Sequence, residues 1–233
     1  MESIETLRER AYQANLELAA TGLVMGTFGN LSIVDRDAGV MVIKPSGVAY
    51  DALTPAHMVA VSLETAQPLD TRFRPSSDTP THLELYRAFP CESVVHTHSE
   101  CATALAQARR PVRCLGTTHA DYFRGDVPVT RALREDEVVT DYERNTGLVI
   151  VETFRHHEHD PLEVPAVLVA NHAPFTWGAS AAAAIEHARV LEFLARLECR
   201  ILAMGGDVPA PDEFLINKHY RRKHGASKYY GQS

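Results

Sequence analysis

Two histidines separated by one residue are the strongest sign of chemistry in this chain. His96-Thr97-His98 ends the apolar segment VVHTH, and residues i and i+2 of a strand point to the same face. Two imidazoles placed in this way can bind one zinc ion at roughly 2.0–2.1 Å. His172 follows the apolar segment VLVAN and would lie at the same sheet edge if both strands end together. Three histidines and an open position are typical of a catalytic zinc site.

Other interpretations of the histidines stay open at this point. Taken alone, His96 and His98 fit two ordinary, partly buried histidines about as well as they fit metal ligands, and His172 favours the metal. The segment 156–160, HHEHD, carries more ligand atoms, but no apolar scaffold holds them in place. We therefore interpret 156–165 as an exposed loop.

Three turns built from small polar residues could bind an oxyanion. Backbone N–H groups approach a phosphate most easily where side chains are small, and hydroxyl groups add donors. Each dipeptide taken singly is more typical of an ordinary turn. Lys44 would add a positive charge beside the second turn. The three turns are Gly29-Asn30, Ser46-Gly47 and Ser76-Ser77.

Two further segments carry groups that could move a proton. Asp121 lies among aromatic residues in THADYFRGD, where partial burial would raise its pKa, although an Asp in a loop is more often a turn former. The basic tail ends near Tyr229 and Tyr230, and we expect these tyrosines to pack against other residues. A phenol there could donate or accept a proton.

The elements that must position these residues follow from apolar spacing and turn formers. The strands at 31–34 and 40–44 flank a turn and predict an antiparallel hairpin. Asp78 could cap the helix that ends before Pro90. The remaining predicted elements are helices from Ile4 to about Gly22, from about 99 to Arg109, over 179–204 and over 212–224, and strands at 94–98, 148–154 and 166–171.

This alternation of helices and strands predicts a single three-layer α/β/α domain. The early hairpin argues against an all-parallel sheet, so we expect a mixed, largely antiparallel one. The chain has 233 residues, of which 45% are hydrophobic, enough to bury a sizeable core.

Composition excludes several classes of protein. A net charge of -7 weighs against a general nucleic-acid-binding face. The first residues lack the pattern of a signal peptide, and no apolar run approaches the roughly 18 residues of a membrane span. We therefore expect a cytoplasmic protein that does not bind membranes. Four cysteines without a Cys-x-x-Cys pair are interpreted as reduced packing residues.

Several segments together resemble the class II aldolase/epimerase family, from the first helix to the last residues. The resemblance implies the fold of that family over residues 1–233 and a homotetramer with sites between subunits. It implies a zinc-dependent epimerase, with one zinc per subunit, that inverts C4 of a ketopentose phosphate in pentose phosphate or arabinose metabolism. The segments are GTFGNLS, IKPSGV, SSDTPTHLELY, VHTHS, GTTHADYFRG, NHAPFTWG and KHYRRKHGASKYYGQ.

The same resemblance implies a role for individual residues. Asp78, His96, His98 and His172 match the family's metal site, and an Asp at position 78 favours epimerisation because the aldolase branch carries Glu there. Asp121 and Tyr230 match the acid/base pair, with Thr117, Glu143 and His219 near them. The residues that match the phosphate and substrate pocket are Gly29, Asn30, Lys44, Ser46, Gly47, Ser76 and Ser77.

Two positions depart from the family pattern. Ala173 follows the third metal histidine where Gly is common, and Phe28 stands where we expect Trp. Two alternatives remain: a class II aldolase that releases its aldehyde, and a non-catalytic binding module with the same fold. The retained metal and acid/base residues argue against the second.

Overall fold

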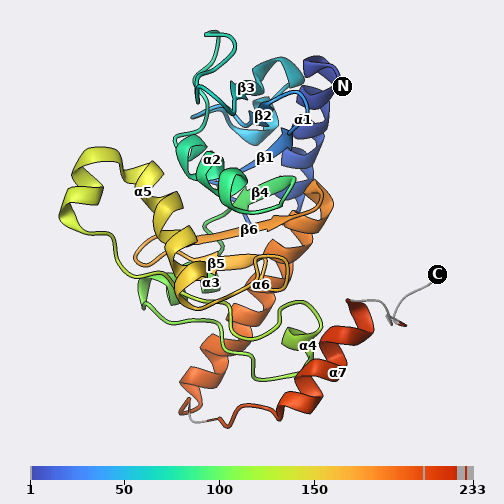
Figure 1. Ribbon diagram of the computed structural model, residues 1–233, viewed down its shortest axis with the longest axis vertical. Coiled ribbons are helices and arrows are strands. Elements are labelled where there is room, and N and C mark those ends of the chain that lie inside the picture. The colour runs from blue at the N-terminus through green and yellow to red at the C-terminus, as the bar shows by residue number, and fades with distance from the viewer. Residues whose placement is uncertain (1, 207, 225–228, 230–233) are drawn as a thin grey trace.

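Six short strands form one sheet that runs through the middle of the molecule (Figure 1). The computed structural model describes residues 2–206, 208–224 and 229. The strand order is β3-β2-β1-β4-β6-β5, and each neighbouring pair is antiparallel. The only parallel pairing among the described residues is a single bridge between Val129 and Leu168. The strands are β1 (Asn30–Asp35), β2 (Val40–Ile43), β3 (Val59–Ser62), β4 (Ser93–His96), β5 (Ala166–Leu168) and β6 (Pro174–Gly178).

Helices cover both faces of this sheet, which confirms the three-layer α/β/α architecture (Figure 1). The first half of α6 and the whole of α1 cover one face, and α2 and α5 cover the other, while α7 packs beside α4. The helices are α1 (Ile4–Ala20), α2 (Thr79–Ala88), α3 (Glu100–Gln107), α4 (Thr117–Ala120), α5 (Glu135–His156), α6 (Ala181–Ala203) and α7 (Glu213–Lys223), with short 3-10 turns at Tyr50–Ala52 and Pro55–His57.

The alternation of side chains along β1 explains how one strand serves two cores. Leu31 and Ile33 pack with the apolar stripe of α1, whereas Val34 belongs to the core on the other face. Ser32 points to that second face and hydrogen-bonds His82 and Tyr86 of α2 at 2.7 Å each. Ser32 thus pairs with His82 Nδ1 and with the Tyr86 hydroxyl, whereas His82 Nε2 is buried without a partner among the described residues.

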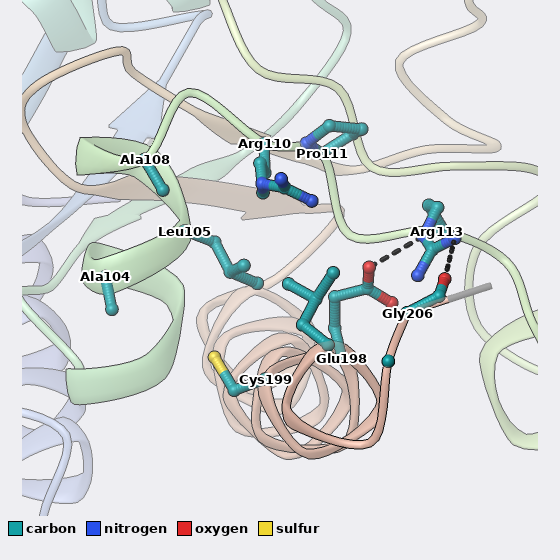
Figure 2. Close-up of a pocket in the computed structure, with 11 residues that line it drawn as sticks. Ala104, Leu105, Ala108, Arg110, Pro111, Arg113, Glu198, Cys199 and Gly206 are labelled. Carbon is teal, nitrogen blue, oxygen red and sulfur yellow. Dashed lines mark hydrogen bonds and ion pairs between the residues drawn. The ribbon is translucent and has the colours of Figure 1, made fainter.

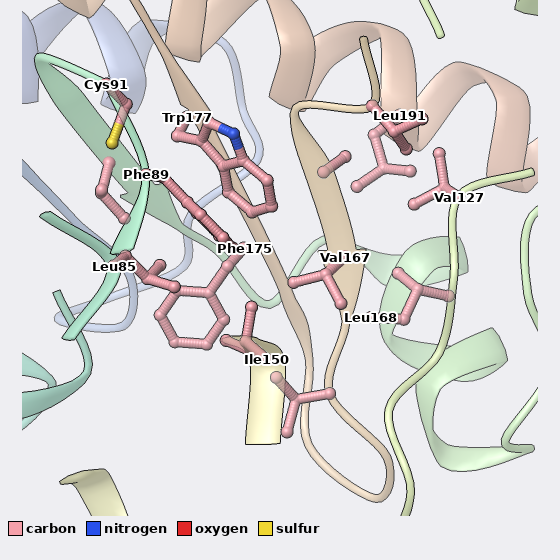
Figure 3. Packing of buried hydrophobic residues seen from close by; sticks show 14 of the residues in the cluster. Leu85, Phe89, Cys91, Val127, Ile150, Val167, Leu168, Phe175, Trp177 and Leu191 are labelled. Carbon is pink, nitrogen blue, oxygen red and sulfur yellow. The ribbon is translucent and has the colours of Figure 1, made fainter. Parts of the chain in front are cut away.

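The second core is built around Trp177 of β6 (Figure 3). The ring of Trp177 lies 4.9 Å from that of Phe89 and 5.2 Å from that of Phe154, and its Nε1 donates to the carbonyl of Pro161 at 2.7 Å. Ile150 of α5 is fully buried beside them. The contacts in this cluster hold α5 against the sheet. α5 carries Tyr142 and Glu143, two residues of the site described below.

One predicted strand is wrong. Residues 148–154 belong to α5, because buried side chains continue at helical steps through Thr146, Ile150 and Thr153. The β-branched run LVIV favours a strand locally, but burial of these helically spaced side chains outweighs that preference. The prediction also missed β3, β6 and α4, and the strand at 94–98 ends at His96. The other predicted elements agree with the structure to within a few residues.

No helix among the described residues is long and apolar enough to cross a membrane. The four cysteines are free thiols, and Cys91 and Cys114 are buried, in agreement with a packing role. Tyr229 is 69% exposed within this chain, and Tyr230 lies outside the described residues, so the expectation that these tyrosines pack against other residues stays a prediction.

Candidate metal and sugar-phosphate site

Three histidines from two chain segments meet at one edge of the sheet. His96 ends β4, His98 follows two residues later, and His172 lies in the turn between β5 and β6. One nitrogen of each ring lies within 4.8 Å of the other two. The Nε2 atoms of His96 and His98 are only 3.1 Å apart. The described part of the chain holds no second group of this kind, and segment 156–160 does not form one.

Hydrogen bonding orients the His96 ring for metal binding. Its Nδ1 donates to the carbonyl of Pro174 at 2.9 Å, and this bond leaves the lone pair on Nε2. Two neutral Nε2 atoms at 3.1 Å would repel each other unless a proton or cation lies between them. Burial, and then His96, lowers the pKa of His172 to about 4 and also lowers that of His98. Neutral imidazoles are the form that binds zinc, so the donor set fits the metal.

The carboxylate of Asp78 lies beside the histidines. Asp78 occupies the N-cap position of α2, but its side chain does not cap the helix. It accepts a hydrogen bond from Asn30 Nδ2 at 2.7 Å, and its Oδ2 lies 4.0 Å from His96 Nε2. Burial raises the pKa of Asp78, but His96, His82 and Asn30 outweigh that effect and lower it. An ionised carboxylate is therefore available to the metal site.

The opposite side of the site is a cradle for an anion. The chain segments at 44–46 and 74–76 run antiparallel, with Ser46 N donating to Arg74 O and Ser76 N donating to Lys44 O, both at 3.0 Å. Lys44 is 1% exposed, and its Nζ lies 3.4 Å from the carbonyls of Thr27 and Pro45. Burial lowers the pKa of this amine. The ring of Tyr50 lies 4.8 Å from this Nζ and adds a cation–π contact. A buried ammonium with two long carbonyl contacts and no carboxylate among its recorded contacts favours an anionic ligand.

Gly29 and Asn30 add two further features of this part of the site. Gly29 has φ 78°, and a Cβ there would lie 2.7 Å from Val24 Cγ1 and 3.0 Å from the carbonyl of His96. Asn30 Oδ1 is buried without a partner among the described residues. In the turn before β6, Asn171 takes the left-handed conformation (φ 63°) and Ala173 does not, so Ala173 is accommodated without strain.

A single pocket of about 350 Å³ joins the metal side and the anion cradle. Every residue that the family resemblance assigned to the metal and phosphate sites lines it, and so does Glu143. Sequence reasoning missed Tyr142, whose hydroxyl lies 3.3 Å from His172 Nδ1. The non-helical residue Asp141 kinks α5 directly before it, and a kink of this kind leaves no clear signal in the sequence. Phe28 also lines the pocket, with its ring 5.6 Å from that of His98.

The expected acid/base group lies apart from this pocket. Thr117, Asp121 and His219 do not line it, and Tyr230 lies outside the described residues. Thr117 begins α4, Asp121 directly follows its last residue, and His219 lies on the adjoining α7. His219 Nδ1 lies 3.1 Å from Asp121 Oδ1. Within one chain, the predicted site residues thus form two separate groups.

A larger cavity, of about 740 Å³, lies between α3 and the end of α6 (Figure 2). In its most buried charged pair, Arg113 Nε donates to Glu198 at 2.7 Å. Arg113 Nη1 donates to the carbonyl of Gly206 at 3.2 Å, and Nη2 is buried without a partner among the described residues. Among the described residues, the side chains that line it include no histidine and no second carboxylate. The chemistry of the described residues is therefore concentrated in the smaller pocket.

Several known proteins are similar to this chain in sequence. A family model described as Class II Aldolase and Adducin N-terminal domain matches residues 9–199. L-ribulose-5-phosphate 4-epimerase UlaF of Salmonella paratyphi A is 47% identical over 230 residues, which are 98% of this chain and 100% of that protein.

Solved structures are similar in fold. One L-fuculose 1-phosphate aldolase has a TM-score of 0.77 at 24% identity and covers 95% of this chain and 97% of its own. The L-fuculose-1-phosphate aldolase from Thermus thermophilus has a TM-score of 0.68 at 27% identity, with 88% of this chain and 100% of its own covered.

Proposed function

Because this chain belongs to the class II aldolase and adducin family, we propose that it interconverts L-ribulose 5-phosphate and D-xylulose 5-phosphate. The observation that carries the proposal is one pocket in which three imidazoles and a carboxylate face a buried lysine. The relative that is 47% identical over nearly the whole chain bears the name of this activity. We further propose that the enzyme is cytoplasmic.

The chemistry of the substrate explains why such a pocket is needed. Removing the proton from C4 of a 2-ketopentose leaves an anion with no adjacent carbonyl to accept its charge. Breaking the C3–C4 bond instead places the electron pair next to the C2 carbonyl, as an enediolate, and releases an aldehyde. Rotation of that aldehyde and re-formation of the bond invert C4.

His96, His98 and His172 would hold the metal, with Asp78 beside them. Bound there, a zinc ion would supply a Lewis acid for the negative charge on the C2 and C3 oxygens, an effect worth several kcal/mol. Pro174 and Asn30 support this set through their bonds to His96 and Asp78. These bonds hold the ligands in place before substrate enters.

The phosphate must stay bound while the aldehyde turns. Lys44 supplies the positive charge, and the two segments that carry it and Ser76 are joined by backbone hydrogen bonds. Small residues at 46, 47, 76 and 77 leave their hydroxyl and N–H groups within reach of the pocket. In this proposal the cradle retains glycolaldehyde phosphate and so prevents its escape.

Two proton-transfer groups are needed, one for the C4 hydroxyl of each epimer. We assign these two roles to Asp121 and Tyr230. We place Thr117 and His219 near them, and Glu143 would contribute from the lining of the pocket. Since Asp121 lies apart from its own chain's pocket, a neighbouring subunit would supply it, and the enzyme would be a homotetramer with sites between subunits. The separation of the two groups within one chain supports this arrangement.

The test is an assay of purified protein with L-ribulose 5-phosphate. We expect D-xylulose 5-phosphate to form, a chelator to abolish the reaction, and added zinc to restore it. Release of free glycolaldehyde phosphate as the main product would instead identify an aldolase. Absence of both products from metal-loaded protein would leave only a binding role and overturn the proposal.

A further inference from the structure

Three side chains in α7 or directly after it converge on Asp121, the residue that follows α4. Arg222 Nε donates to Asp121 Oδ1 at 2.8 Å, and Arg222 Nη2 donates to Oδ2 of the same carboxylate. His219 Nδ1 lies 3.1 Å from Oδ1, and His224 Nε2 lies 3.0 Å from the backbone carbonyl of Asp121. The Asp121 and Arg222 side chains are only 11% and 23% exposed.

This two-point contact is more than an ordinary surface ion pair. A guanidinium that meets both oxygens of a carboxylate fixes the rotation of the carboxylate as well as its position. Burial by itself would raise the pKa of Asp121, but Arg222 and then His219 lower it below its usual value. Asp121 is therefore held ionised and in one orientation, which is what a proton acceptor requires.

We infer that Arg222 is a positioning residue for the reaction: its guanidinium holds the Asp121 carboxylate ionised and aimed for proton transfer at C4. This inference rests on the proposed function. In this inference Arg222 does not contact the substrate. It affects the reaction only by binding the two carboxylate oxygens of Asp121.

The other charged groups near Asp121 do not replace this contact. Lys223 Nζ lies 4.1 Å over the ring of Tyr122, and its charge also favours the ionised carboxylate. Within α4, His119 faces away and pairs its Nε2 with the carbonyl of Gly125 at 2.7 Å. From α6, Glu186 accepts a hydrogen bond from Tyr122 at 3.2 Å. Among these groups, Arg222 contacts both carboxylate oxygens.

The first experiment compares Arg222→Gln with Arg221→Gln, an exposed arginine one position earlier on the same helix. Both are assayed for epimerisation across pH with zinc in excess. We expect Arg222→Gln to lower kcat about 100-fold with little change in KM, because a small misplacement of a reacting group has an effect of this size. We expect Arg221→Gln to behave as the unmodified enzyme.

The pH profile distinguishes positioning from mere docking of α7. Without Arg222 the pKa of Asp121 rises, so the acid limb of the pH–activity profile, where activity falls on acidification, should move to higher pH. We expect a shift of about 1–3 pH units, the usual effect of a neighbouring opposite charge. Free guanidinium should restore part of the activity of Arg222→Gln. An unchanged acid limb together with no response to guanidinium would overturn the inference.

Arg222→Lys covers the case in which the glutamine variant does not fold. A lysine keeps a charge but loses the second contact, so kcat should fall while the acid limb stays close to that of the unmodified enzyme. A normal kcat in Arg222→Lys would contradict a role for the two-point contact. If the unmodified enzyme is inactive on L-ribulose 5-phosphate, the proposed function has failed, whereas an active enzyme indifferent to Arg222 removes this inference alone.

Discussion

The backbone carbonyl of Pro174 decides which nitrogen of His96 can bind a metal. Since Nδ1 donates to that carbonyl, the Nε2 lone pair points toward His98 and His172. The partner carbonyl belongs to β6, a strand that sequence patterns did not predict. The residue types of the metal site could thus be named from the sequence, but the orientation of this ring could not.

Replacing His98 by Asn should remove bound zinc. The amide cannot reproduce the imidazole nitrogen that faces His96 Nε2, so we expect zinc content well below one ion per chain by elemental analysis. His156→Asn is the matched control, because His156 lies in the exposed His-rich segment, and it should retain full zinc content. Full zinc content in His98→Asn would contradict the ligand assignment.

Asp121→Asn tests the proposed proton acceptor. An amide cannot accept the C4 hydroxyl proton, so kcat should fall about 10²–10⁴-fold while zinc content stays constant. Asp37→Asn, in the exposed turn between β1 and β2, serves as the control. A near-normal rate in Asp121→Asn would remove this residue from the mechanism.

His119 should make folding stability depend on pH. Burial lowers the pKa of His119 from 6.5 to about 4. Between pH 6.5 and about 4, His119 is therefore protonated in the unfolded chain and neutral in the folded chain. The contribution of His119 to the free energy of unfolding should therefore decrease as pH falls through this window, by at most about 1.4 kcal/mol per pH unit. Urea unfolding at pH 7 and pH 5 measures the change. His119→Gln should reduce it, and an equal slope in both proteins would refute the assignment.

At the scale of elements, α5 shows where local patterns mislead. A β-branched run within it favours a strand, yet helical spacing of buried residues and contact with α2 make it a helix. The same helix is interrupted at Asp141, and this places Tyr142 and Glu143 at the pocket. Neither the helix nor its kink could be recognised from a short segment, because both depend on packing against distant parts of the chain.

Ile150→Ala tests how strongly α5 is held by the core. Ile150 is fully buried in the cluster around Trp177, so truncation should lower the free energy of unfolding by about 2–5 kcal/mol. Val139→Ala, in the same helix but 77% exposed, should change it by less than about 0.5 kcal/mol. Chemical denaturation measures both, and equal effects would indicate that α5 is not part of the core.

At the scale of the whole molecule, the two groups of predicted site residues lie apart. The candidate metal ligands and the anion cradle share one pocket, whereas Asp121 and His219 contact each other where α7 packs beside α4. Figure 1 shows these two helices side by side, away from the strand β1. A reaction that needs both groups in one site therefore needs two chains. This requirement can be tested without a structure of the assembly.

Mixing two inactive variants provides that test. In random 1:1 tetramers of His98→Asn and Asp121→Asn, about one quarter of the sites combine an intact pocket with an intact Asp121 from the neighbouring chain. We expect about that fraction of the unmodified activity after the subunits are dissociated and reassembled together. Each variant reassembled alone should stay inactive. If mixed tetramers of normal size recover no activity, the pocket and Asp121 of one site must come from the same chain.

The sequence by itself determined the family, the layer architecture and the residue types of the site. Residue chemistry and spacing are local, and the segments around the histidines, Lys44 and Asp78 carry enough of both. Only the tertiary structure decided which of these residues meet. It brought His172 to His96 through the pairing of β4 with β6, and it placed Asp121 against Arg222, because long-range packing sets these distances and neighbouring residues along the chain do not.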